Sequence, residues 1–126
     1  MMGQAVELAK VFSAKLTAVS VVDYSVMTYV DANGVVLMPE VLDAIKDSFE
    51  LVLGRCRALA EKAGLEFKQE ILNGNPAGRI VQYSEDNGTD LIAIGHIGKS
   101  VVSELLLGSV AHKVSNYAKC SVFVVK

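Results

Sequence analysis

The chain has 126 residues, so one domain is the default expectation. It is 52% hydrophobic but only 6% aromatic, and aliphatic runs of this kind suit a parallel sheet that is covered on both faces. With a net charge of −2, no apolar run near the roughly 20 residues of a membrane span and no secretory leader, we expect a cytoplasmic protein that binds neither nucleic acid nor membranes.

The N-terminal third opens with a predicted helix and a strand. The helix has one face that carries Val6 and Ala9 and a neighbouring face that carries Val11. Leu16–Val22 is rich in β-branched residues and predicts a strand. The region that follows contains Asn33-Gly34, which predicts either a small hairpin or a mobile connection, and the sequence leaves both open.

The sequence of the middle of the chain predicts a long helix, followed by a strand with one solvent-exposed face. Pro39 suits a first helical turn and Gly64 suits a C-terminal stop. Between them, we expect one apolar face made of Val41, Leu42, Ile45, Phe49, Val52, Cys56, Leu59 and Ala60. Apolar and charged residues then alternate over Leu65–Ile71, as in a strand at the edge of a sheet.

The last third continues the alternation of helices and strands. Asn75 and Pro76 predict the N-cap and first position of a helix that ends near Asn87. Strand Leu91–Ile94, a helix over Val110–Ala118 and strand Ser121–Val125 follow. Strands that alternate with helices indicate βαβ crossovers, so we predict an open parallel sheet with helices on both faces.

Two glycine turns flank the point where a ligand is expected. Gly95-His96-Ile97-Gly98-Lys99-Ser100 comes directly after a predicted buried strand, and ligands of open α/β sheets bind at the carboxyl ends of strands. Glycines there allow a close approach of the backbone and positive φ angles. Gly108-Ser109-Val110 opens the next helix, whose free N–H groups favour an anion such as phosphate.

The spacing of these glycines can be compared with the glycine patterns of known phosphate-binding loops. Walker A and Rossmann fingerprints both fail at Ala93, where each needs a glycine. The observed pattern, G-2x-G-9x-G-[S/T], resembles the ATP-binding branch of the universal stress protein family. Asn73–Pro76, Asp86–Gly95 and Leu105–Val110 resemble further signatures of that family, so the likeness covers nearly the whole chain.

The resemblance implies a fold and a site. The fold would be a Rossmann-like three-layer sandwich, like that of the adenine nucleotide alpha hydrolases, with a five-stranded parallel sheet in the order 3-2-1-4-5. Val21 matches the residue that packs on adenine, and Gly95–Ser100 match the loop around ribose and phosphates. Gly108, Ser109 and Val110 match the helix start that binds the triphosphate. ATP or another adenine nucleotide would bind, with Mg²⁺ or Mn²⁺ bridging its phosphates.

One departure from the family pattern concerns its first strand and acidic turn. In the family, that strand lies between the strands equivalent to Leu16–Val22 and Leu91–Ile94, whereas Met1 already lies at the first helix. Three interpretations stay open: the strand belongs to a segment ahead of Met1, the two flanking strands pair directly, or Val35–Met38 replaces it. An unfilled position would leave unpaired backbone groups, at about 1–3 kcal/mol each.

The sequence gives little support for catalysis. His96 and His112 have no identifiable partner that would act as base or orienter, and no His/Cys/Asp cluster has metal-ligand spacing. Cys56 and Cys120 lack C-x-x-C spacing and suit a reducing compartment as small apolar side chains. We therefore expect at most slow ATP turnover.

The closing strand predicts a partner. Val122–Val125 is apolar on both faces, so at a sheet edge it needs cover, which the same strand of a second copy would supply in a homodimer. Burial under a helix of the same chain is the alternative. Three functions follow: an ATP-binding stress or regulatory protein, a ligand-free interaction module, and a weak nucleotide-hydrolysing or adenylate-transferring enzyme. The intact glycine spacing favours the first.

Overall fold

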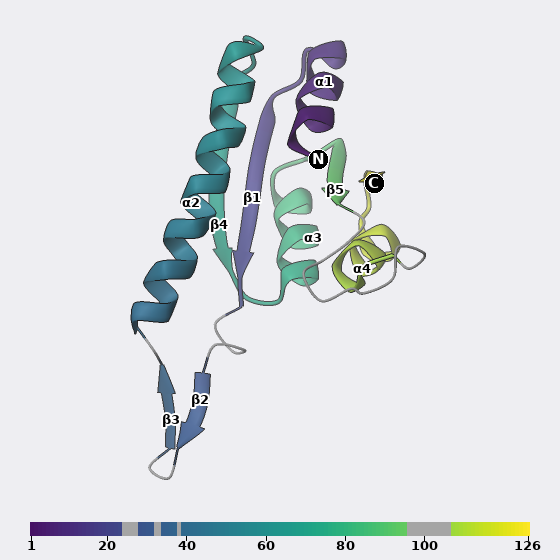
Figure 1. Cartoon of the computed structure of the whole chain (residues 1–126). Helices are drawn as coiled ribbons and strands as arrows, with labels where there is room; N and C mark the ends of the chain where they lie inside the picture. The colour runs from purple at the N-terminus through teal and green to yellow at the C-terminus, as the bar shows by residue number, and fades with distance from the viewer. Residues whose placement is uncertain (24–27, 32–33, 38, 96–106) are drawn as a thin grey trace.

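The structure is a computed structural model, and it describes residues 1–23, 28–31, 34–37, 39–95 and 107–126 (Figure 1). Helices and strands alternate along the chain, as the sequence predicts. In chain order the elements are α1 (Met2–Phe12), β1 (Leu16–Val22), β2 (Thr28–Asp31), β3 (Gly34–Leu37), α2 (Pro39–Lys62), β4 (Phe67–Asn73), α3 (Pro76–Asp86), β5 (Leu91–Gly95), α4 (Ser109–Tyr117) and β6 (Ser121–Val125).

Helix α1 buries one of the two neighbouring faces that the sequence indicates and exposes the other. Val6 and Ala9 are 5% and 7% exposed, whereas Val11 and Phe12 on the neighbouring face are 76% and 68% exposed. The helix ends at Ser13, which adopts the left-handed conformation that usually closes a helix at glycine. Helix α1 therefore keeps a large apolar surface that the described residues do not cover.

Helix α2 buries a different stripe from the predicted one. Leu53 and Ala60 are 3% and 0% exposed, whereas Val52 and Leu59 are 43% and 39% exposed, so their predicted place on the buried face is wrong. Val52 and Leu53 are adjacent and both apolar, and they lie three and four residues after Phe49, so helical spacing alone does not decide which of them is buried. The stop at Gly64 is confirmed, with a φ of +74°.

The strands form three separate pairs. Strand β1 pairs with β4 in parallel, from Leu16 opposite Phe67 onward, and β5 pairs with β6 in parallel, from Leu91 opposite Ser121 onward. Strands β2 and β3 form an antiparallel hairpin that projects away from the other elements in Figure 1. The hairpin and the parallel pairs are confirmed, but the described strands do not join into one continuous sheet.

Two of the three interpretations of the absent family strand are therefore wrong. Strands β1 and β5 do not pair with each other among the described residues. The run that begins at Val35 cannot replace a central parallel strand, because Val35 and Val36 pair with Val30 and Tyr29 in the antiparallel hairpin. A hairpin closes a short loop, which costs less chain entropy than a distant parallel pairing.

Helices lie on both sides of the strands. Helix α2 contacts β1, β4 and α1, while α3 contacts β1, β4 and α4. The two helical layers enclose the strand layer, which gives the Rossmann-like three-layer α/β arrangement. Along the part of the chain that the structure describes, no helix is long and apolar enough to cross a membrane.

Candidate functional site

Two of the predicted site residues lie at or near the carboxyl ends of β1 and β5. Val21 is half-buried near the end of β1, beside the almost fully buried Val22. The carbonyl oxygen of Val22 accepts a hydrogen bond from the N–H of Gly74, 3.0 Å away, so the turn after β4 fixes this end of β1. Gly95 is the last residue of β5.

Gly95 does not use the left-handed region that a glycine permits. Positive φ angles among the described glycines occur at Gly64, Gly74 and Gly88 instead. A Cβ on Gly95 would lie 3.5 Å from the Sδ of Met1, an ordinary van der Waals distance. Neither backbone strain nor crowding by described residues requires glycine at this position.

Among the residues that the structure describes, no side chain caps the N-terminus of α4. Gly108 is the N-cap, with φ −59° and ψ 151°, and it is buried. No described side chain caps the first turn by a hydrogen bond, and no acidic residue lies in this turn. The Gly108 carbonyl accepts the first helical bond from the His112 N–H at 2.8 Å. Free first-turn amides of a helix favour an anion, and exposed Ser109 adds a hydroxyl at this helix start.

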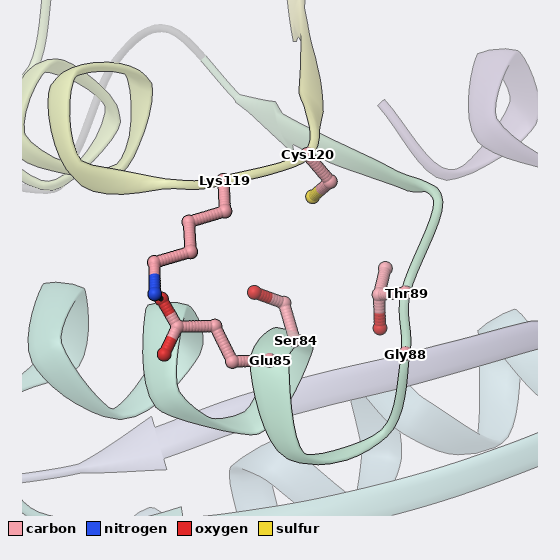
Figure 2. A pocket seen from close by; sticks show the side chains of 6 residues that line it. All are labelled: Ser84, Glu85, Gly88, Thr89, Lys119 and Cys120. Atoms are coloured by element: carbon pink, nitrogen blue, oxygen red, sulfur yellow. Dashed lines mark ion pairs between the residues drawn. The ribbon is translucent and has the colours of Figure 1, made fainter.

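A separate open pocket of about 370 Å³ lies at the other end of the strands (Figure 2). Its lining comes from the segments just before β5 and β6: Ser84, Glu85, Gly88, Thr89, Lys119 and Cys120. The Nζ of Lys119 lies 3.8 Å from Glu85 Oε1, and the hydroxyl of Ser84 donates to the Val81 carbonyl. The protein's own cation thus sits near the carbonyl end of α3, where a cation is favoured.

Sequence reasoning did not predict this pocket, because it searched the segments that follow strands. The signal available was weak: a helix end, a lysine and a cysteine before the last strand. Both of the pocket's charged groups already pair with each other. We therefore assign the candidate ligand site to the carboxyl ends of the strands and not to this pocket.

The titratable groups of the described residues suggest no catalytic centre. His112 is exposed, and its Nε2 lies 3.2 Å from the Nδ2 of Asn116 one turn later. Cys56 and Cys120 are both free thiols, and burial raises the pKa of Cys56. Within the described ranges, no three His, Cys, Asp or Glu side chains gather as metal ligands.

The comparison with known families agrees with this geometry. The model of the universal stress protein family matches residues 1–126. This chain belongs to the universal stress protein family. Universal stress protein MJ0531 of Methanocaldococcus jannaschii is 36% identical over 122 residues, which cover 97% of this chain and 71% of the relative.

Solved structures show the same fold. Universal stress protein UspA from Lactobacillus plantarum has a TM-score of 0.80 at 30% identity, covering 98% of this chain and 85% of that protein. A universal stress protein in complex with cAMP has a TM-score of 0.68 at 22% identity, covering 98% of this chain and 82% of that one. The Archaeoglobus fulgidus protein in complex with dAMP, at 19% identity and a TM-score of 0.66, also shares the fold.

The structure describes only part of the site that the sequence of this universal stress protein predicts. Val21 and Gly95 lie near or at the carboxyl ends of β1 and β5, and Gly108, Ser109 and Val110 form the start of α4. Helix α4 contacts β6, which is the partner strand of β5. The predicted residues between these two groups lie outside the described residues: His96, Ile97, Gly98, Lys99 and Ser100.

Proposed function

We propose that this chain is a cytoplasmic stress-response protein that binds ATP or another adenine nucleotide and signals its presence to partners. Val21 would pack on the adenine, the turn from Gly95 to Ser100 would hold the ribose and phosphates, and Gly108, Ser109 and Val110 would bind the triphosphate. Mg²⁺ or Mn²⁺ would bridge the phosphate oxygens.

One observation carries this proposal: the first turn of α4 begins at a buried glycine and has neither a side-chain cap nor a carboxylate. A helix start of this kind presents free N–H groups and the positive end of the helix dipole, which suit a phosphate. Family members of the same fold that are solved with cAMP and dAMP give a precedent for adenine nucleotides on this scaffold.

Binding of a fluorescent mant-ATP analogue, with and without Mg²⁺, tests the proposal. The wild type should bind, and the Gly98→Val variant should lose at least about tenfold in affinity, because a branched side chain would occupy space meant for the phosphates. Leu51→Ala on the exposed surface of α2 serves as a matched surface control, since Leu51 is 61% exposed. Absence of mant-ATP binding in the wild type would favour a ligand-free interaction module instead.

The same proposal includes a homodimer through Val122–Val125. Among the described strands, β6 pairs only with β5, and Phe123 on it is 42% exposed. Antiparallel pairing with a second β6 would cover this edge and give a two-fold dimer. Light scattering should report a dimer at micromolar concentration, and Val124→Pro should shift it toward the monomer. A wild type that stays monomeric would refute the dimer and leave nucleotide binding untouched.

A further inference from the structure

The pocket of Figure 2 gathers three charged or nucleophilic side chains that the proposed nucleotide site does not use. Glu85 comes from the last turn of α3, whereas Lys119 and Cys120 come from the segment between α4 and β6. Ser84 and Thr89 add two hydroxyl groups to the lining. We call this open hollow of about 370 Å³ the thiol pocket.

The sulfur atom of Cys120 is directed into the thiol pocket. Figure 2 shows its Sγ pointing toward the space between Ser84 and Thr89. Cys120 is half-buried and is a free thiol. On the far side of the pocket, a Cβ on Gly88 would meet no non-neighbouring atom within 4 Å. A small molecule that enters the pocket can therefore reach the sulfur.

The two charged groups of the thiol pocket form an ion pair that a ligand can open. The Nζ of Lys119 lies 3.8 Å from Glu85 Oε1, which is longer than the about 2.7–2.9 Å of a charge-assisted hydrogen bond. The two side chains are 81% and 38% exposed, so water already competes with the pair and separating it costs little. The carbonyl end of α3 adds partial negative charge beside Glu85.

These charges favour a ligand that carries both signs. A polyanion would be repelled by Glu85 and by the negative end of α3, and a dication would be repelled by Lys119. A zwitterion can instead place its carboxylate beside Lys119 and its ammonium group beside Glu85, so that two ion pairs replace one weak pair. A disulfide with amino acid halves has this charge pattern, and it also carries sulfur atoms with which a thiol reacts.

We propose that the thiol pocket recognises a low-molecular-weight disulfide with amino acid halves and that Cys120 becomes linked to one half. The Cys120 thiolate, after its proton passes to water, attacks one sulfur of the disulfide. The S–S bond of the ligand breaks, a new S–S bond forms to Sγ, and the other half leaves as a thiolate that takes a proton from water. The disulfide is the oxidant: Cys120 is oxidised and the departing half is reduced. This proposal does not depend on nucleotide binding.

Cys56 provides a control thiol within the same chain. It is free and half-buried like Cys120, but it lies on α2, and burial raises its pKa, which lowers its thiolate fraction. With L-cystine as the probe, peptide mass spectrometry should show modification of Cys120 at least about tenfold faster than that of Cys56. Dithiothreitol should remove the added half by a second exchange.

Three disulfides of different charge test recognition by the pocket. Each half of L-cystine is a zwitterion, whereas cystamine is a dication and dithiodipropionate is a dianion. The rate at Cys120 in the folded chain is divided by the rate in the same chain unfolded in urea, which removes the intrinsic reactivity of each reagent. This ratio should be at least about threefold higher for L-cystine than for either of the other two.

Two variants that remove one charge each assign the recognition to residues. Lys119→Gln should reduce the preference for L-cystine over cystamine, because the group that repels the dication is lost. Glu85→Gln should reduce the preference for L-cystine over dithiodipropionate for the converse reason. Each preference should fall at least about twofold. Lys113→Gln, on the exposed surface of α4, is the matched control and should change neither preference.

Any one of three results would overturn the proposal. Equal rates at Cys56 and Cys120 in the folded chain would show that the pocket does not favour its own thiol. Equal ratios for the three disulfides would show that Cys120 is merely accessible. Unchanged preferences in both Lys119→Gln and Glu85→Gln would show that the ion pair plays no part in recognition. Binding of mant-ATP is measured separately, so a failure here leaves the proposed function intact.

Discussion

The N-termini of α3 and α4 follow parallel strands of the same fold but are completed in different ways. In α3, the side chain of Asn75 accepts a hydrogen bond from the Gly78 N–H at 3.0 Å, and Pro76 occupies the first turn without needing a donor. In α4, Gly108 offers no side chain, and the first turn holds no acid. One helix start is capped by the protein, and the other is left available.

The two helix starts differ in purpose: the start of α3 is built for stability, and we interpret the start of α4 as built for ligand binding. The amides at a helix start need partners, and a local Asn supplies one at the lowest cost in chain entropy. A glycine at the N-cap cannot supply this side-chain hydrogen bond. A bound anion could accept hydrogen bonds from the same amides instead, and three substitutions test this interpretation.

The largest effect is expected from Gly108→Asp. A carboxylate at the N-cap of α4 should take the place of the ligand anion, because it accepts from the same amides and repels phosphate. Affinity for mant-ATP should fall at least about tenfold, while the free energy of unfolding should change by less than about 1 kcal/mol, because the burial of Gly108 offsets the gain from the cap. Fluorescence titration and urea denaturation measure the two quantities on the same preparation.

Gly108→Asn separates charge from shape. Asn has nearly the same size as Asp and caps a helix comparably, but it carries no charge. It should retain clearly more mant-ATP affinity than the Asp variant. Equal losses in both variants would show that the side chain blocks the site by its volume, and electrostatic competition at α4 would then be refuted.

A medium effect is expected at the other helix start. Asn75→Ala should lower the free energy of unfolding by about 1 kcal/mol, because the Gly78 amide loses its acceptor. Affinity for mant-ATP should stay within about twofold, since the Asn75 side chain caps its own helix through Gly78 and is not a predicted nucleotide residue. Asn75→Asp should preserve stability. A large loss of nucleotide affinity in Asn75→Ala would mean that α3 and not α4 borders the ligand.

Sequence reasoning succeeded where the determinant is local. Asn75 and Pro76 correctly predict the N-cap and the first residue of α3. The bounds of β1 and β6 coincide with the predicted strands. It failed for the stripe of α2, because the adjacent Val52 and Leu53 offered two nearly equal phases and only packing against β1 and β4 selected one.

Long-range pairing was harder to predict than local structure. The parallel partnership of β1 with β4 followed from the family resemblance, but the gap between β1 and β5 depends on hydrogen bonds between distant segments. For the site, α4 begins at Ser109 with Gly108 as its N-cap, and no described side chain caps it, but its role in binding stays a prediction. The roles of His96 to Ser100 stay predictions, because those residues lie outside the described ranges.

The smallest effect is expected from Lys119→Ala in the pocket of Figure 2, at the opposite end of the strands. The ion pair with Glu85 spans 3.8 Å, and the lysine side chain is 81% exposed, so the loss should be at most about 0.5 kcal/mol. Affinity for mant-ATP should not change, because the phosphates would lie at the carboxyl ends of the strands. Lys113→Ala, on exposed α4 surface, provides a charge-matched control. If Lys119→Ala alone weakened binding, the nucleotide would occupy the pocket before β5 and β6, and the uncapped start of α4 would need another explanation.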